Sequence, residues 1–479
     1  MKSRNLSRDP HLIAPRRGGR LFAFRNLAGI EQAKLGLALL LLVVGFLLGG
    51  TSGDFPGRAM VIELVAVMSL TLTLATWHGP RPSWAAIAGT LLILALPLMQ
   101  LIPLPPKIWQ IFPGRDVARE IAAFIDPDMW RPITLDSDAT MKSWLSLFVP
   151  VAMFLAVLQL PSAQRLLLCY AVIAIGMASL LLGMIQATSG NDRLYLFDST
   201  QNGLPLGFFA NRNHQAALMY VSAGMSLLMA KRASLNGSAQ RLLYFGLVFV
   251  FTAGIFATGS RAGLGLLGVT ILLFIPIFAG HRINWWMALV GAASVAAFGF
   301  LLSQSGVVQD AVARFALLST EGRYDIWSEA WFAANAYYPI GAGLGTFVKS
   351  YQAMEPLAAV TPYYVNHAHN DYLELVLELG VCAYLAIGLF LAWYATRTFR
   401  VLFREPRDSA NLVARAALIA ILALLLHSIV DYPIRTFAHL GLFGMLCSLL
   451  YRPPQMRQTP ADAGARPEEI QTAMSPPNM

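Results

Sequence analysis

Long blocks of apolar residues alternate with polar segments along most of the chain. The first block, Ala33–Gly49 (AKLGLALLLLVVGFLLG), is apolar at nearly every position. A helix of about 20 apolar residues crosses a hydrocarbon layer roughly 30 Å thick. The blocks do not alternate apolar and polar residues one by one, which favours helices over the strands of a membrane barrel. The pattern therefore predicts an all-α, polytopic membrane protein.

Twelve such blocks predict about 12 transmembrane helices. They are Ala33–Gly49, Ala59–Trp77, Trp84–Leu104, Trp144–Leu160, Leu166–Ala187, His214–Ala230, Leu242–Thr258, Ala262–Ala279, Trp285–Leu302, Leu373–Tyr394, Leu412–Ile429 and Phe437–Tyr451. Three cysteines, Cys169, Cys382 and Cys447, fall inside these blocks. We interpret them as small packing residues, because disulfides between loops cannot form there.

Lys and Arg residues are distributed unevenly between the two sides of this arrangement. With the N-terminus inside, the inner segments and the inner ends of the spans hold 22 of the 35 basic residues, and the outer segments hold the other 13 over far more loop residues. Basic residues concentrate in the cytoplasmic connections of membrane proteins. The bias predicts that both termini are cytoplasmic, and the long basic segment before the first block favours an uncleaved span over a signal peptide.

The connections divide the chain into three parts. Residues 1–32 form a basic cytoplasmic segment, residues 33–451 form the transmembrane helical domain, and residues 452–479 form a polar tail that we expect to be disordered. The long outer, periplasmic loops are 105–143, 188–213 and 303–372, the last between the ninth and tenth spans. Long connections with structure of their own usually carry function.

Composition narrows the class of protein further. The chain has 479 residues, of which 56% are hydrophobic and only 13% charged, whereas soluble domains carry about 25% charged residues. This composition excludes a soluble enzyme and a nucleic-acid-binding domain. The expected partner of this chain, with its formal net charge of +9, is therefore the lipid bilayer and not a nucleic acid.

The polar residues most suggestive of chemistry stand at the outer end of the tenth block, in NHAHNDYLELVLELGVCAY (Asn366–Tyr384). His369 would lie at the N-terminus of a helix, with Asn366 or Asn370 as its cap. The positive end of the helix dipole disfavours the imidazolium form, so His369 is expected to be neutral and able to accept a proton. A histidine that only caps or anchors the helix is the alternative.

A metal site is a second interpretation of the same stretch. His367 and His369 are two residues apart, so on a regular helix they point in nearly opposite directions and cannot chelate one ion. His367, Asp371, Glu374 and Glu378 do share one helix face at spacings of four, three and four. A carboxylate as deep in the block as Glu378 is expected to face protein or a water-filled cavity.

Three arginines lie on the predicted outer side, against the bias of the basic residues. They are Arg212 in FFANRNH, Arg261 in TGSRAGLG and Arg323 in EGRYDIWSEAW. Arginine forks match phosphate oxygens in geometry and stay charged at any relevant pH. Converging arginines would form a pyrophosphate site, and the alternative is that each one reaches lipid headgroups or a nearby acid. The glycines of PIGAGLGTF (Pro339–Phe347) are interpreted as a tight backbone turn, because no strand precedes them.

In this order the residues resemble the O-antigen ligase and polysaccharide polymerase superfamily, which also includes protein O-oligosaccharyltransferases. The family pattern is His, then Asn, Ser or Gln, then nine residues and Gly-x-x-Gly. His369, Asn370 and Gly380 match it, and Ala383 replaces the final glycine. Further stretches that look like family features are Gly259–Arg261, Gly322–Arg323 with Trp327 and Trp331, Pro339–Gly345 and HSIVDYPIRT (His427–Thr436). The similarity covers roughly 211–436.

The resemblance implies a metal-independent, inverting glycosyltransferase at the periplasmic face of the bacterial inner membrane, with no cofactor. The donor would be a glycan on undecaprenyl pyrophosphate, and the acceptor a second glycan or lipid A-core. His369 would be the general base that activates an acceptor hydroxyl. The substrate-binding residues would be Arg261, Arg323, Arg212, Asn370 and Glu378, with the arginines holding the pyrophosphate.

Other functions remain open at this point. A polymerase and a ligase differ only in the acceptor, and HSIVDYPIRT slightly favours a polymerase of exopolysaccharide or O-antigen. A protein acceptor is a further alternative. A transporter or flippase of lipid-linked sugars is the rival from another class, but it would need polar groups along a path through the bilayer.

Overall fold

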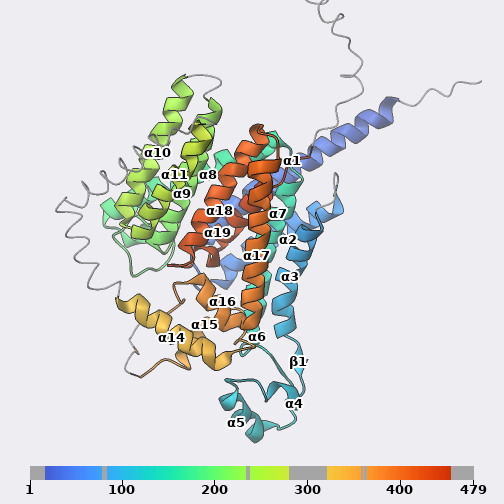
Figure 1. Ribbon diagram of the computed structural model, residues 1–479, viewed down its shortest axis with the longest axis vertical. Helices are drawn as coiled ribbons and strands as arrows, with labels where there is room; N and C mark the ends of the chain where they lie inside the picture. Colours follow the sequence, from blue (N-terminus) through green and yellow to red (C-terminus); the bar gives the residue numbers. More distant parts are fainter. Residues whose placement is uncertain are drawn as a thin grey trace, which may run out of the picture.

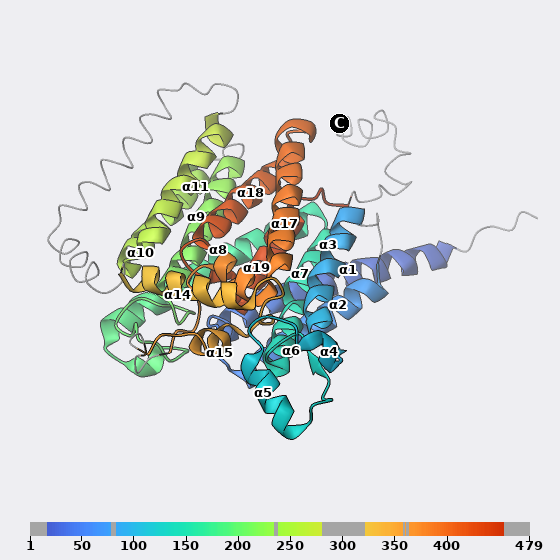
Figure 2. The same cartoon turned by 60° about the horizontal axis from the view of Figure 1, so that its bottom comes forward.

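The protein is described here by a computed structural model over residues 17–77, 83–233, 238–279, 321–357, 360 and 364–454. The described residues are mostly helical, and one short antiparallel pair is formed by strands β1 (Pro103–Leu104) and β2 (Arg131–Pro132) (Figures 1 and 2). The helices are α1 (Arg17–Leu48), α2 (Pro56–Ala75), α3 (Trp84–Gln100), α4 (Pro106–Trp109), α5 (Asp116–Ile125), α6 (Ser137–Ser146), α7 (Phe148–Leu158), α8 (Ser162–Ser189), α9 (Arg212–Ala233), α10 (Ser238–Thr258), α11 (Arg261–Ala279), α14 (Glu321–Tyr337), α15 (Phe347–Gln352), α16 (Asp371–Leu379), α17 (Val381–Phe399), α18 (Ser409–His427) and α19 (Phe437–Leu449), with short turns η1 (Asp192–Leu194), η2 (Arg400–Arg404) and η3 (Pro433–Arg435).

Among the described residues, eight helical stretches are long and apolar enough to cross a membrane, which indicates a multi-pass membrane protein. They are Gly29–Leu48, Pro56–Ala75, Ser137–Leu158, Ser162–Ser189, Ser238–Thr258, Arg261–Phe278, Val381–Arg404 and Ser409–His427. Shorter apolar helices, Ala86–Gln100 and Phe437–Leu449, correspond to the third and twelfth predicted spans. The ninth, Trp285–Leu302, lies outside the described residues, so the expected total of about 12 is not confirmed.

Helix α9 corresponds to the sixth predicted span but is not among the eight. It carries polar residues such as His214, Gln215 and Ser222, and it is nevertheless buried along nearly its whole length. Helices α8, α10, α11 and α18 surround it. Small residues permit this close packing, because a Cβ at Gly176 of α8 would lie only 2.2 Å from Ser222 Oγ. The protein, and not lipid, forms the environment of α9.

The tenth predicted span, Leu373–Tyr394, is wrong as one continuous helix. It is divided at Gly380 into α16 and α17, and Gly380 has a φ of 56° and a ψ of −132°. A Cβ at this position would lie 2.0 Å from the carbonyl oxygen of Pro339. Only glycine permits both this conformation and this approach. Helix α16 has nine residues, about 14 Å at 1.5 Å per residue, which is too short to cross the bilayer.

Helices α14, α15 and α16 lie together across one end of the helical bundle, and α4 and α5 lie beyond them (Figures 1 and 2). The glycine-rich loop between α14 and α15 is hydrogen-bonded to α16. The backbone N–H groups of Ala342 and Gly343 donate to the carbonyls of Leu377 and Glu378, at 3.0 and 2.9 Å. Gly343 has a φ of 115°. The interpretation of this loop as a tight turn is confirmed.

Candidate functional site

His369 stands directly before α16, at the end of the bundle that α14 covers. Asn370 is the N-cap of α16, and its side-chain oxygen accepts hydrogen bonds from the N–H groups of Tyr372 and Leu373, both at 3.1 Å. This confirms one of the two expected caps. His369 has a φ of 49°, a left-handed conformation that is strained for a histidine. Neighbouring contacts must therefore hold it in place.

Glu374 supplies those contacts from the first turn of α16. Its Oε1 lies 2.8 Å from His367 Nδ1, and its Oε2 accepts a hydrogen bond of 3.0 Å from the N–H of Ala368. Burial acts to raise the pKa of Glu374, but Arg435 and His367 outweigh it and lower the pKa to about 2. A fully buried, ionised carboxylate thus fixes the segment that presents His369.

Asp431 orients the ring of His369. Its Oδ1 lies 3.2 Å from His369 Nδ1, and the carboxylate is fully buried, whereas 23% of the His369 side chain is exposed. Burial acts to raise the pKa of Asp431, but the hydrogen bond with His369 outweighs it and holds the pKa well below its usual range. An ionised carboxylate only accepts hydrogen bonds, so Nδ1 of His369 donates to it, and in the neutral imidazole Nε2 is then the acceptor.

The same carboxylate connects His369 to the turns that carry two of the arginines. Asn213 donates a hydrogen bond to Asp431 Oδ2, and Ser260 Oγ donates to Asn213 Oδ1 at 2.8 Å. Arg212 and Arg261 are the sequence neighbours of these two residues, at the N-termini of α9 and α11. Gly259 forms the expected tight turn, with a φ of 65°, and a Cβ there would lie 3.8 Å from Arg212 Nη1.

The turns of Arg212 and Arg261 are linked by these hydrogen bonds, and their role as an anion site stays a prediction. Arg261 is exposed and Arg212 is half-buried, and the two helix N-termini add partial positive charge beside them. Arg323 lies in the first turn of α14, but its side chain is outside the described residues. The position of the Arg323 side chain is therefore untested, and the convergence of the three arginines stays a prediction.

Glu378 is fully buried and bound within the protein. Its Oε2 lies 2.9 Å from Arg435 Nη1, and its Oε1 accepts a 2.8 Å hydrogen bond from the N–H of Gly345. Arg435 also lies 3.4 Å from Glu374 and 3.5 Å from Asp371. The three acids share one face of α16 as expected and surround Arg435, whereas His367, expected on the same helix face, precedes the helix. Burial raises the pKa of Asp371 and that of Glu378, each to about 7.

Asp431, Tyr432 and Arg435 are site residues that the sequence interpretation quoted within HSIVDYPIRT without giving them roles. The ring of Tyr432 lies between two histidines, with centroid distances of 4.2 Å to His367 and 4.9 Å to His369. The sequence did contain a signal for these residues. HSIVDYPIRT places polar residues between two apolar blocks, in the same way as NHAHNDY places polar residues before the tenth block.

The two histidines do not converge on a common point. His367 Nδ1 faces Glu374, and His369 Nδ1 faces Asp431. The expectation that they cannot chelate one ion rested on a regular helix. In the structure both precede α16, and each has its own carboxylate.

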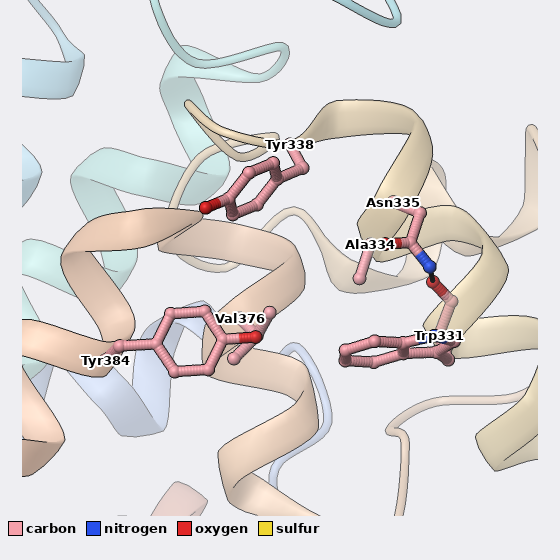
Figure 3. A pocket seen from close by; sticks show the side chains of 6 residues that line it. All are labelled: Trp331, Ala334, Asn335, Tyr338, Val376 and Tyr384. Atoms are coloured by element: carbon pink, nitrogen blue, oxygen red, sulfur yellow. Dashed lines mark hydrogen bonds between the residues drawn. The ribbon is translucent and has the colours of Figure 1, made fainter.

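A cavity of ≈ 270 Å³ lies between α14 and the junction of α16 with α17 (Figure 3). Its lining residues are Trp331, Ala334, Asn335, Tyr338, Val376 and Tyr384. None of them belongs to the hydrogen-bonded network of His369 and Asp431. The chemistry at His369 and the cavity are therefore distinct features.

Comparison with known proteins adds two findings. A family model described as O-Antigen ligase matches residues 245–388. The teichuronic acid biosynthesis protein TuaE of Bacillus subtilis (strain 168) is 24% identical over 301 residues, which cover 58% of this chain and 59% of that protein. The chain thus spans about three fifths of the length of this relative. The family match includes His369 and ends before Asp431.

Proposed function

We propose, from the match of residues 245–388 to the O-Antigen ligase family model and the similarity to the teichuronic acid biosynthesis protein, that the chain is a membrane glycosyltransferase of polysaccharide biosynthesis. The observation that carries the proposal is the His369–Asp431 pair at the mouth of the site. Asp431 holds the imidazole with Nε2 as the proton acceptor, which is the arrangement that general-base catalysis requires.

In the proposed reaction, Nε2 of His369 takes the proton of an acceptor hydroxyl. The acceptor oxygen attacks the anomeric carbon of the donor sugar, and the bond from that carbon to the pyrophosphate oxygen breaks. The electron pair leaves with the pyrophosphate, and attack from the opposite side inverts the anomeric centre. Asp431 stabilises the imidazolium that forms. The step needs no metal ion and no cofactor.

Arg261, Arg212 and Arg323 are proposed to bind the pyrophosphate. Negative charge grows on the leaving group, and arginine donors with two helix N-termini would stabilise it. The link from Asn213 to Asp431 supports this assignment for Arg212 and Arg261, because it joins their turns to the base. For Asn370 and Glu378 we propose that the contribution to substrate binding is indirect: one caps α16 and the other ties α16 to Arg435 and Gly345.

The proposed donor is an undecaprenyl-pyrophosphate-linked glycan, and the proposed location is the periplasmic face of the bacterial inner membrane. The acceptor distinguishes a polymerase, which uses a second lipid-linked glycan, from an O-antigen ligase, which uses lipid A-core. Teichuronic acid biosynthesis in the name of the relative is an argument for the polymerase. A protein acceptor is the further alternative.

The test is glycan transfer by the purified protein in lipid nanodiscs, with lipid-linked donor and each acceptor supplied separately. His369→Ala should lower the transfer rate by about 10²–10⁴-fold, the usual contribution of a general base. His367→Ala is the matched control, because this neighbour contacts the ring of the same tyrosine, Tyr432, but binds Glu374. It should retain much more activity at equal expression.

Two results would reject the proposal. Equal activity of the His369→Ala and His367→Ala variants would leave His369 as a helix-flanking residue only. Movement of the donor across the bilayer of proteoliposomes, with no new glycosidic bond by mass spectrometry, would instead establish the rival transporter or flippase of lipid-linked sugars.

A further inference from the structure

The cavity between α14 and α16–α17 is lined by aromatic side chains that project from two different helices. Trp331 and Tyr338 belong to α14 or its end, and Tyr384 belongs to the first turn of α17. Their exposed fractions are 51%, 47% and 50%. Figure 3 shows the rings of Trp331 and Tyr384 extending toward one another from opposite sides, with Val376 between them.

The side chains that line the cavity are uncharged, and they include both apolar and polar groups. Aromatic faces carry negative charge density and attract the weakly positive C–H groups of a sugar ring. Indole N–H, phenol hydroxyl and amide groups supply hydrogen bonds for sugar hydroxyls. Asn335 is already oriented, because its Nδ2 donates to the carbonyl of Trp331 at 3.0 Å (Figure 3).

Other ligand classes match this lining less well. A pyrophosphate would find no cationic side chain among the six lining residues. An isoprenoid or acyl chain would leave the phenol and amide groups without partners, which costs free energy. Interfacial aromatic residues also anchor membrane proteins, but such anchors need not converge on a common cavity. The volume of ≈ 270 Å³ is near the lower end of known ligand pockets, roughly 300–1,000 Å³.

The two helices that frame the cavity also carry residues of the proposed active centre. Val376 follows Asn370 by six residues on α16, which is about 9 Å along the helix axis. Trp331 follows Arg323 by eight residues on α14, about 12 Å along its axis. A short oligosaccharide can bridge such distances.

We propose that this cavity is a saccharide-binding subsite, which holds a glycan unit at a distance from the bond that forms at His369. The role of the bound glycan in transfer rests on the proposed function, whereas the binding itself does not. The subsite positions the substrate chain by stacking against Trp331 and Tyr384, and Asn335 and Tyr338 bind its hydroxyls.

The test measures binding of soluble, lipid-free sugars to the full chain in phosphatidylethanolamine–phosphatidylglycerol nanodiscs. The probes are trisaccharides of hexoses, of N-acetylhexosamines and of hexuronic acids, followed by saturation-transfer NMR. At least one probe should bind saturably, and Trp331→Ala and Tyr384→Ala should each weaken it about tenfold. Trp130→Ala is the matched control, because Trp130 is 62% exposed and lies outside the cavity.

The His369→Ala variant separates this inference from the proposed function, since it should abolish transfer and leave sugar binding unchanged. Binding that depends on Trp331 in a protein without transferase activity would reject the proposed function and support the subsite. The subsite is rejected if no probe binds at millimolar concentration. It is also rejected if Trp331→Ala and Tyr384→Ala retain sugar binding and lose only thermal stability, which would identify them as membrane anchors.

Discussion

At the scale of single residues, the position of His369 depends on its neighbours more than on its own conformational preference. A left-handed histidine is strained by about 1–3 kcal/mol unless the surroundings fix it. Glu374 fixes the preceding peptide, Asn370 begins the helix that follows, and Asp431 binds the ring. These three contacts hold His369 in a conformation in which 23% of its side chain stays exposed.

Asp431 should contribute mainly to the rate constant. Asp431→Asn keeps the shape of the side chain but removes the charge that fixes the tautomer and stabilises the imidazolium. We expect kcat to fall by about 10²–10⁴-fold with a nearly unchanged KM. Steady-state kinetics of glycan transfer measures both constants, and Asn213→Ala provides a control that disturbs the same network on its far side. A loss confined to KM would contradict the role of Asp431 as the partner of the base.

Arg261 should require its guanidinium group and not only its charge. Arg261→Lys keeps one positive charge at the N-terminus of α11 but cannot make a two-pronged contact with phosphate oxygens. We expect a loss of about tenfold or more in kcat/KM for the lipid-linked donor. Arg193→Lys, at a position in the η1 turn on the same side of the bundle, should change kcat/KM little. Equal effects of the two substitutions would indicate general electrostatic attraction instead of a specific contact.

At the scale of elements, α16 illustrates what the sequence could and could not predict. The cap at Asn370 and the common face of Asp371, Glu374 and Glu378 follow from local rules of helix geometry. The break at Gly380 does not, because VLELGVCAYL is apolar enough to continue a span and the break depends on contact with Pro339, 41 residues earlier. The partner of the acids, Arg435, is likewise distant in sequence.

The partner of the proposed base, His369, could not be predicted from the sequence either. Residue chemistry indicated His369, but its carboxylate partner is 62 residues away and lies beyond two spans, those of α17 and α18. Local pattern cannot pair two polar stretches that meet only after α18 has returned the chain to the same end of the bundle. Likewise the sequence predicted that Arg212 and Arg261 converge, but it could not predict the packing of α9 against α11 that brings their turns together.

The acidic face of α16 predicts a dependence of stability on pH. Burial raises the pKa of Asp371 from 3.8 to about 7, so the folded state holds a proton that the unfolded state releases. This contribution to stability is complete below about pH 4 and declines as the pH rises through 7. Asp371→Asn mimics the protonated form. It should raise the melting temperature at pH 8 by roughly 2–4 °C, by less at pH 5, and hardly at all below about pH 4.

Thermal unfolding of the detergent-solubilised protein, followed by static light scattering, would measure this dependence. Asp128→Asn is a suitable control, because Asp128 is exposed and its substitution should not alter the pH profile. A lower melting temperature for Asp371→Asn at pH 8 would show that the attraction between Asp371 and Arg435 outweighs the cost of burying the charge.

At the scale of the whole molecule, the two ends of the bundle differ in character. The end with His369 carries long structured connections, including α5, α14 and α15 (Figures 1 and 2). At the opposite end the described connections 159–161 and 405–408 are short, and Arg165, Arg397, Arg400 and Arg404 lie beside them. Basic residues next to short connections determine orientation, whereas long connections cross the membrane largely regardless of charge.

This asymmetry predicts that the end with His369 faces outward. Leu357→Cys would place a thiol at a position that is 94% exposed at that end, and Pro406→Cys would place one at the opposite end. In intact spheroplasts, a membrane-impermeant maleimide should label Leu357→Cys and leave Pro406→Cys unlabelled until the cells are opened. Of the native cysteines, Cys169 and Cys447 are buried, whereas Cys382 is half-buried, so both variants carry Cys382→Ser as well. The reverse labelling would invert the topology and place His369 on the cytoplasmic side, where a periplasmic donor could not reach it.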